Sequence, residues 1–363
     1  MPSPLIYLTE GSRIAFSSLK NRFSPKQYEG DAAQICGQIV KDCWNGRFFQ
    51  TSTREGNFPQ FWTRDFGFCT ASLLKLGYKE EVQATLRYAL HRFKWARKIT
   101  TTITPQGKPY DFPTIAADSL PWFIHSLKLA RFPYQDHRAF LNREIQTYYQ
   151  ELLNHNTGMI RPELELSSLK DLAIRKSSCY DNCMVGMLAQ DLKSMKLVNP
   201  FAAYHYPELL LRHFWNGRFF SDDLQKKSFV AGDANIFPFL SGLIKDEEKL
   251  RSGVQAMQEA ELDQPFPLKY TARKSSIELR WQEKLALPNY EGNAMWMHLG
   301  PLYVKLVKAI DAEKTEKYKQ AYQKLIEQHK NFYEVFAPDG KLYRSWYYAA
   351  SPGMLWAANY LTL

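Results

Sequence analysis

The sequence of 363 residues lacks the features that mark several special classes of protein. It has no run of about 18 apolar residues, which a membrane-spanning helix would need. Its start shows no basic segment followed by an apolar one, so we expect no signal peptide and a cytoplasmic protein. Low-complexity stretches and clear linkers are missing as well. We therefore predict one domain over residues 1–363, with residues 1–28 as an N-terminal extension.

Cysteine is scarce, with five residues in the whole chain. An odd number without paired spacings is not typical of a disulfide framework. Cys179 and Cys183 would share one helix face, but no second Cys or His pair follows closely, so a zinc site is not favoured. We expect neither a metal nor a cofactor.

Long basic runs are also absent, although the chain carries 47 Lys and Arg against 37 Asp and Glu, a net charge of +10. The cations are mixed with acids, as in 245–249, whereas a nucleic-acid-binding protein usually gathers them in a patch. We therefore expect neither nucleic acid nor membrane as a partner. Charge alone leaves an anionic substrate and the oligomeric state open.

Aromatic residues are abundant at 15%, with 9 Trp, 21 Tyr and 23 Phe. A large hydrophobic core is one explanation. A sugar-binding cleft is the other, because aromatic faces stack on the C–H faces of pyranose rings and line many small-molecule sites.

Apolar residues recur at helical spacing along most of the chain. The pattern predicts helices over 31–44, 66–76, 79–98, 119–129, 137–153, 181–195, 207–215, 235–244, 247–261, 291–310, 312–332 and 352–361. The connections are mostly short and few segments alternate as strands do. This order favours a series of antiparallel helix pairs.

A six-residue repeat supports that architecture. Trp-Asn-Gly-Arg-Phe-Phe occurs at 44–49 and again at 215–220, and weaker variants stand at 156–161 and 338–343. Each strong copy ends an apolar helix with Asn-Gly, a common left-handed cap. The same turn at the same end of about six hairpins predicts an all-α fold, an (α/α)6 barrel with short β segments in its loops. An open helical solenoid is the structural alternative.

The long loops between alternate helices should gather at one end of such a barrel and form a site there. Trp62, Arg64 and Asp65 stand just before an apolar helix. Asp65 alone could be a helix cap. Together the three side chains offer an aromatic platform, N–H donors and a carboxylate acceptor, which suits a polyhydroxylated ring.

Asp118 begins the strongly apolar helix that contains Trp122. It could cap that helix, or it could be a general acid, since apolar surroundings favour the neutral carboxyl group. Two more groups of polar residues stand where helices are expected to begin. They are Tyr180, Asp181 and Asn182, and Asn289, Glu291, Trp296 and His298. One such group alone could be a helix cap. With those at Asp65 and Asp118 there are four in successive hairpins, and four predict the lining of one cavity.

Glu334 lies among aromatic residues at an expected helix end, and Trp346 follows it. A carboxylate is unfavourable near the C-terminal end of a helix dipole, so a functional role is favoured for Glu334. His298 could serve as a base, although a histidine within a helix is more often structural.

In this order along the chain, the motifs resemble those of the six-hairpin glycosidases, which include glucoamylases, debranching-enzyme glucosidases, processing α-glucosidases, trehalases and neutral invertases. Residues 61–65 resemble the glucoamylase Trp-Thr-Arg-Asp. Residues 118–123 resemble the segment that holds the general acid in debranching enzymes and invertases. Residues 332–340 with Trp346 resemble the segment that holds the general base, and 180–182 are similar to the Trp-Asp-Asn of the processing glucosidases.

The resemblance implies an inverting, exo-acting glycoside hydrolase for an α-glucoside or a related small or terminal glycoside. Asp118 would be the general acid and Glu334 the general base. The remaining residues would bind the carbohydrate substrate: Trp62, Arg64, Asp65, Trp122, Tyr180, Asp181, Asn182, Asn289, Glu291, Trp296, His298 and Trp346. Pro121, Ala337 and Tyr347 depart from the family pattern and leave the identity of the sugar open.

Three other functions stay open at this point. A sugar isomerase or epimerase on a helical barrel would use His298 and His125 in place of paired acids. A non-catalytic carbohydrate-binding relative could keep the carboxyl groups in an altered pocket. A helical repeat scaffold should lack the cluster of Arg and carboxyl groups.

Overall fold

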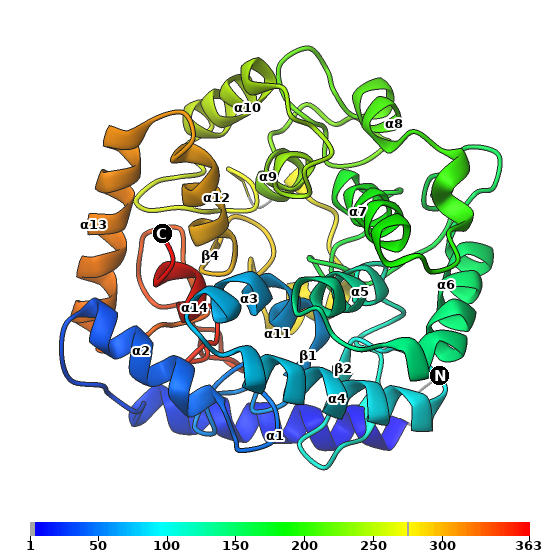
Figure 1. Cartoon of the computed structure of the whole chain (residues 1–363). Helices are drawn as coiled ribbons and strands as arrows, with labels where there is room; N and C mark the ends of the chain where they lie inside the picture. Colours follow the sequence, from blue (N-terminus) through cyan, green and yellow to red (C-terminus); the bar gives the residue numbers. More distant parts are fainter. Residues whose placement is uncertain (1–3, 274–275) are drawn as a thin grey trace.

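The computed structural model describes residues 4–273 and 276–363, and its helices form two concentric layers (Figure 1). The inner layer contains α3 (Thr63–Lys75), α5 (Ser119–Leu129), α7 (Cys179–Met195), α9 (Gly232–Leu240), α12 (Leu299–Val307) and α14 (Ala357–Tyr360). The outer layer contains α2 (Ala32–Cys43), α4 (Lys79–Ala96), α6 (Arg138–Leu152), α8 (Tyr206–His213), α10 (Glu247–Glu259) and α13 (Ala312–His329). Helix α14 packs against both α12 and α3, which closes the inner ring. The fold is therefore the predicted (α/α)6 barrel.

The two layers differ in where their apolar residues lie. Inner helices such as α7 are buried along most of their length, from Cys179 through Leu192. Outer helices bury one stripe only, and in α2 that stripe comprises Ala32, Ile35, Cys36, Ile39, Val40 and Cys43. Because each inner helix is covered on both sides, one hydrophobic cluster runs through the ring, from Tyr28 to Ala358. Burial of this kind is the main source of stability of such a fold.

Helix α12 begins at Leu299, eight residues later than expected for the helix at 291–310. The preceding residues form turns and the short strand β4 (Met295–Trp296), which pairs antiparallel with β5 (Val335–Phe336). The sequence pattern was misleading here because Met295 and Trp296 pair with a distant segment, a contact that local periodicity does not report. This pairing has a functional consequence, since it brings two distant loops together.

Further elements lie outside the two layers, among them the short β segments expected in the loops. Helix α1 (Pro4–Phe23) fills most of the segment expected as an N-terminal extension, whose residues 1–3 lie outside the described residues. Short elements occupy the loops: β1 (Phe61–Trp62), β2 (Thr102–Ile103), β3 (Pro109–Tyr110), α11 (Trp281–Ala286), and the 3-10 turns η1 (Gln135–His137) and η2 (Pro200–Ala203). Strand β2 pairs with β1 on one side and β3 on the other. In the described ranges no helix combines the length and the apolar character needed to cross a membrane.

The six-residue repeat forms the same turn at both places. Trp44 bridges to Phe49 and Trp215 bridges to Phe220, each antiparallel. The turn is closed by asparagine: Asn45 Oδ1 accepts the N–H groups two and three residues later at 2.9 Å, and Asn216 Oδ1 does the same at 3.0 and 2.9 Å. The helices themselves end earlier, at Cys43 and His213, so Asn-Gly forms a turn beyond the helix and is not its cap.

Gly46 and Gly217 hold this turn at φ values of 86° and 100°. A Cβ at either position would meet no atom within 4 Å, so a substitution to alanine tests backbone conformation alone. We expect Gly46→Ala and Gly217→Ala each to lower the free energy of unfolding by about 1 kcal/mol, because a left-handed φ disfavours a side chain.

Gly37 supplies the matched control, since it lies within α2 and its added Cβ would also meet no atom within 4 Å. We expect Gly37→Ala to raise the free energy of unfolding by about 0.5–1 kcal/mol. Denaturant unfolding of the three variants measures the difference. Equal effects in helix and turn would contradict this account of the repeat.

Candidate active site

A cavity of about 270 Å³ opens at the end of the ring where the loops before the inner helices gather. Its volume is near the lower end of the range for small-molecule sites. Helix α1 and five loop regions line it: Tyr7, Glu10, Gly11 and Ile14; Thr51, Phe58, Trp62, Arg64, Asp65 and Phe68; Tyr110 and Phe112; Leu169, Asp171 and Leu172; Leu287, Tyr290, Glu291, Trp296 and His298; and Glu334, Tyr347, Tyr348, Met354 and Trp356.

The cavity brings together half of the residues singled out from the sequence. Those that line it are Trp62, Arg64, Asp65, Glu291, Trp296, His298 and Glu334. Those that do not are Asp118, Trp122, Tyr180, Asp181, Asn182, Asn289 and Trp346. Most residues of the second group are buried in the barrel and do not reach the cavity.

The short strands set the positions of several lining side chains. Pairing of β1 with β2 places Trp62 opposite Thr102, and β3 adds Tyr110 to the same sheet. Pairing of β4 with β5 places Trp296 opposite Val335, and the N–H of Met297 donates to the carbonyl of Glu334 at 3.0 Å. Loops that are about forty residues apart in sequence therefore meet at fixed positions.

Glu334 is almost fully buried and three donors hold its carboxyl group. The Tyr290 hydroxyl donates to Oε1, while Oε2 accepts from the Tyr348 hydroxyl at 2.5 Å and the Ser351 N–H at 3.0 Å. Burial raises the pKa of Glu334, and the three hydrogen bonds act in the opposite direction. The donors favour the ionised form and so offset part of the effect of burial.

Asp118 lies behind the cavity wall with no exposed side-chain area. Its Oδ2 accepts from Arg64 Nε at 2.6 Å and from the Tyr180 hydroxyl at 2.8 Å. Although Asp118 stands at the N-cap position of α5, its side chain does not cap the helix. The carboxylate instead fixes the guanidinium of Arg64 from the side away from the cavity.

Asp171 occupies the cavity side of the same guanidinium. Its Oδ1 accepts from Arg64 Nη2 at 3.0 Å and from Ser167 Oγ at 2.6 Å. Its side chain keeps 19% of its area exposed, against 0% for Asp118. Burial raises the pKa of Asp171 more than Arg64 lowers it, so the net shift is upward. Sequence reasoning missed Asp171, whose only signal is its place in the long loop before α7.

Two buried cations hold the loop that carries Asp171. Lys170 Nζ lies 3.0 Å from Asp222 and 2.8 Å from Asp233, and it has no exposed side-chain area. Arg175 Nη1 lies 3.0 Å from Asp233. These ion pairs anchor the chain on both sides of Asp171 to the start of α9 and the segment before it.

Glu291 contacts the same loop from another direction. Its Oε2 accepts the N–H of Leu172 at 2.8 Å, and its own N–H donates to Glu283 Oε1 at 2.9 Å. Burial, followed by the nearby charges of Glu283 and Asp171, raises the pKa of Glu291 well above its usual value. A protonated Glu291 can still accept this backbone hydrogen bond.

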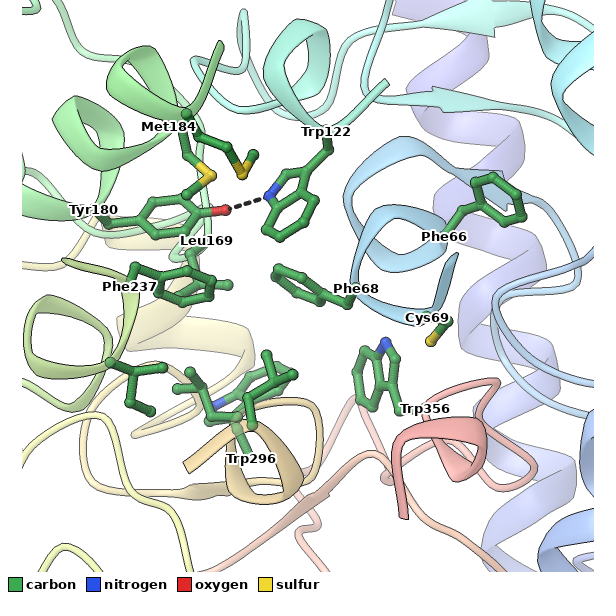
Figure 2. Close-up of a cluster of buried hydrophobic side chains, with 14 of the residues drawn as sticks. Phe66, Phe68, Cys69, Trp122, Leu169, Tyr180, Met184, Phe237, Trp296 and Trp356 are labelled. Carbon is green, nitrogen blue, oxygen red and sulfur yellow. Dashed lines mark hydrogen bonds between the residues drawn. The ribbon is translucent and has the colours of Figure 1, made fainter. Parts of the chain in front are cut away.

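Buried aromatic side chains gather in one cluster (Figure 2). Phe68, Trp296 and Trp356 line the cavity as its aromatic wall, whereas Trp122 and Tyr180 do not line it. The indole Nε1 of Trp122 donates to the Tyr180 hydroxyl at 3.0 Å. Tyr180 in turn donates to Asp118, and Trp122 packs edge-on against Phe68 with 4.9 Å between the ring centroids.

Asp181 and Asn182 serve the architecture of α7. Asp181 accepts from Ser178 Oγ at 2.6 Å, and burial raises its pKa to about 6. Asn182 Oδ1 accepts the N–H of Ile160 at 3.1 Å, and its amide donates to the carbonyl of Ser178 at 2.8 Å. Asn182 therefore ties the turn that holds Ile160 to the inner helix, whereas Asp181 bonds to the residue that caps it.

His298 faces the cavity as a neutral imidazole, because burial and then Arg64 lower its pKa well below the usual value. The Tyr270 hydroxyl donates its one hydrogen to the carbonyl of Leu169 at 3.1 Å and lies 3.1 Å from His298 Nε2. We therefore assign the ring proton to Nε2, which leaves Nδ1 as an acceptor. This buried Nδ1 has no partner within residues 4–273 and 276–363.

Asp65 and Trp62 complete the polar lining. Asp65 Oδ1 accepts from Trp356 Nε1 at 3.0 Å, and burial raises the pKa of Asp65 to about 7, an effect that Arg64 opposes. The indole N–H of Trp62 is buried and finds no acceptor in the described part of the chain. With His298 Nδ1, it offers a ligand one donor and one acceptor.

Two residues expected in the site lie away from it. Asn289 shapes a turn, where its Oδ1 accepts the N–H of Asn293 at 2.9 Å. Trp346 is 69% exposed, and its indole donates to the carbonyl of Leu285 at 2.8 Å. Among the described residues, His, Cys, Asp and Glu form no group of three placed to hold a metal ion.

Comparisons with known proteins find similarity in structure only. No family model matches the chain, and no curated protein matches its sequence. A glycosidase variant superimposes with a TM-score of 0.67 and 12% identity, over 97% of this chain and 96% of that one. A rhamnosidase from Klebsiella oxytoca with rhamnose bound gives 0.61 and 11%, over 93% of this chain and 64% of that one.

A glucoamylase from Hormoconis resinae superimposes with a TM-score of 0.60 and 10% identity, over 91% of this chain and 72% of the glucoamylase. Identities of this size establish a shared fold and no more. The chain therefore shares its (α/α)6-barrel fold with these solved structures.

Proposed function

We propose that the protein is an inverting glycoside hydrolase that acts on the end of a small glycoside, with Asp171 as general acid and Glu334 as general base. The observation that carries this proposal is that two carboxyl groups from different loops line one cavity with opposite hydrogen-bond surroundings. Asp171 has both of its side-chain donors on Oδ1, whereas Glu334 has donors on both oxygens. The neighbours of the fold, which are named as glycosidases, support the same class.

The roles follow from these surroundings. A general acid must hold a proton and deliver it to the leaving oxygen, and Oδ2 of Asp171 is the atom left for it. Burial favours the protonated form of this group. A general base must be ionised to take a proton from water, and the three donors on Glu334 favour that form. An inverting pair needs space for one water between sugar and base.

The acid role expected for Asp118 is better supported at Asp171. Asp118 does not line the cavity, and Arg64 and Tyr180 occupy its Oδ2. We assign Asp118 the positioning of Arg64, whose other amino group holds Asp171.

The sugar ring would lie against the aromatic wall. Trp62 Nε1, His298 Nδ1 and the carboxyl group of Asp65 are the polar atoms available to its hydroxyls. The low basicity of His298 disfavours the alternative of an isomerase that uses this histidine as its base.

A screen of p-nitrophenyl glycosides, trehalose, sucrose, maltose and isomaltose tests the function directly. For the substrate that is cleaved, proton NMR of the first-formed sugar should show the anomer opposite to that of the substrate, because water attacks from the face opposite the leaving group. Retention of the anomer would reject the inverting pair. Conversion of a free sugar without cleavage would favour the isomerase.

Removal of the acid and removal of the base should differ in their dependence on the leaving group. We expect Asp171→Asn to lower kcat on a disaccharide about 10²–10⁴-fold, and much less on an aryl glycoside whose leaving group needs no proton. Glu334→Gln should be equally slow on both substrates, since the attacking water still needs a base.

Asp118→Asn is the matched control for that experiment, because it changes the other carboxylate of Arg64. We expect its loss of activity to be the same on both substrates. Selective recovery of Asp118→Asn on the aryl glycoside, with none for Asp171→Asn, would return the acid role to Asp118. Circular dichroism of each variant checks that the fold is intact.

The acidic limb of the pH profile should follow Glu334. Burial raises its pKa, so the limb of kcat/KM should lie above the usual value of a glutamate. Tyr348→Phe removes a donor to the ionised form and should move this limb to higher pH. Tyr343→Phe removes a hydroxyl that bonds the carbonyl of Pro288, and it should leave the limb in place. A limb that does not move in Tyr348→Phe would contradict Glu334 as the base.

A further inference from the structure

Helix α1 forms one wall of the cavity, although it lies outside the two rings of helices. Four of its residues line the cavity: Tyr7, Glu10, Gly11 and Ile14. Their spacing of three, one and three places them on one helix face. In Figure 1, α1 (blue) crosses the lower part of the ring.

Hydrogen bonds fasten α1 to several loops around the cavity. The Tyr7 hydroxyl donates to the carbonyl of Asp111 at 2.9 Å, and Arg13 Nη1 donates to that of Asn57 at 3.0 Å. The Tyr347 hydroxyl donates to the carbonyl of Gly11 at 3.1 Å, and the N–H of Ala349 donates to Ser18 Oγ at 2.6 Å. The helix is therefore a fixed wall and not a loose cover.

Gly11 has no packing reason to be glycine. It lies within a 20-residue helix, where glycine is unfavourable relative to alanine. A Cβ at this position would meet only the Tyr347 hydroxyl, at 3.9 Å, which is ordinary contact. Since Gly11 also lines the cavity, the missing side chain enlarges the space available to a ligand.

The charge of the lining restricts the ligand as well. Five carboxyl groups and one guanidinium line the cavity, namely those of Glu10, Asp65, Asp171, Glu291, Glu334 and Arg64. Arg64 is already paired with Asp118 at 2.6 Å and Asp171 at 3.0 Å. A ligand carboxylate or phosphate would find no unpaired cation among the described lining residues.

We propose that α1 closes one end of the cavity, that Gly11 limits the size of the ligand there, and that the substrate is a short uncharged glycoside of about disaccharide size. This inference rests on the proposed function for the cleavage of that substrate. Gly11 accepts from Tyr347, whose neighbour Tyr348 donates to Glu334, so this wall borders the proposed base.

The test uses maltose, cellobiose and mannobiose, each with its trisaccharide and with the disaccharide oxidised to an aldonate at its reducing end. For the disaccharide that is cleaved, we expect kcat/KM to fall at least 10-fold for the trisaccharide and for the aldonate. Equal rates for the dimer and trimer, or for the dimer and aldonate, would overturn the proposed substrate class.

Gly11→Phe tests the wall itself, and it should lower kcat/KM for the same disaccharide at least 10-fold. Ser12→Phe is the matched control, since Ser12 is exposed and lies outside the lining, and it should keep the wild-type value. Gly11→Ala should fold normally and retain more activity than Gly11→Phe. A folded Gly11→Phe protein with wild-type kcat/KM would overturn the role of Gly11.

Binding separates this proposal from the hydrolase proposal. Tryptophan fluorescence of the Asp171→Asn protein, titrated with the three disaccharides, should show binding that Gly11→Phe weakens at least 10-fold and Ser12→Phe does not. Binding that follows this pattern without any cleavage by the wild type would reject the hydrolase and keep the wall. Cleavage that is insensitive to Gly11→Phe would keep the hydrolase and reject the wall.

Discussion

The buried guanidinium of Arg64 is the interaction on which the arrangement of the site depends. It joins the start of α3 to Asp118 at the start of α5 and to Asp171 in the loop before α7. Three successive hairpins are therefore fastened together at the loop end of the barrel. Burial alone would lower the pKa of Arg64, but Asp118 and then Asp171 raise it well above its usual value. A buried cation without such partners would cost several kcal/mol, so the charged guanidinium depends on both carboxyl groups.

A second set of buried charges extends this constraint to the rest of the loop that carries Asp171. Lys170 and Arg175 pair with Asp222 and Asp233. The residues on both sides of Asp171 are therefore fixed by ion pairs that cannot separate without leaving a buried charge unpaired. Buried ion pairs of this kind are weak evidence for stability, because desolvation offsets much of their attraction. They do impose geometry, and a group that must deliver a proton to one atom needs a fixed position more than it needs a stable loop.

The fold was more readable from the sequence than the site. Helical spacing and the repeat at 44–49 and 215–220 fixed the hairpins, since periodicity reports which face of a helix is buried. The same pattern could not show that Asp118, at the start of an apolar helix, does not line the cavity, because a sequence pattern does not give the direction of a side chain. Asp171 stands in an irregular loop without periodicity, and only the partners of Arg64 reveal it. The strand pair β4–β5, which takes the place of the start of the helix expected at 291–310, depends on contacts between distant segments.

The chain carries a net charge of +10, whereas its cavity is lined mainly by carboxyl groups. The net charge of the whole chain is therefore a poor guide to the charge of the ligand. Cations on the surface are solvated and screened within about 8–10 Å, so they contribute little inside the cavity. The lining carboxyl groups are desolvated instead, and burial raises the pKa of Asp65 to about 7 and that of Glu291 well above its usual value. Protons therefore neutralise part of the cavity at neutral pH, while Glu334 keeps its donors and can stay ionised. A cavity that holds both protonated and ionised carboxyl groups at one pH can give a proton at one place and accept one at another, and burial makes this possible by moving the pKa values away from those of surface carboxyl groups.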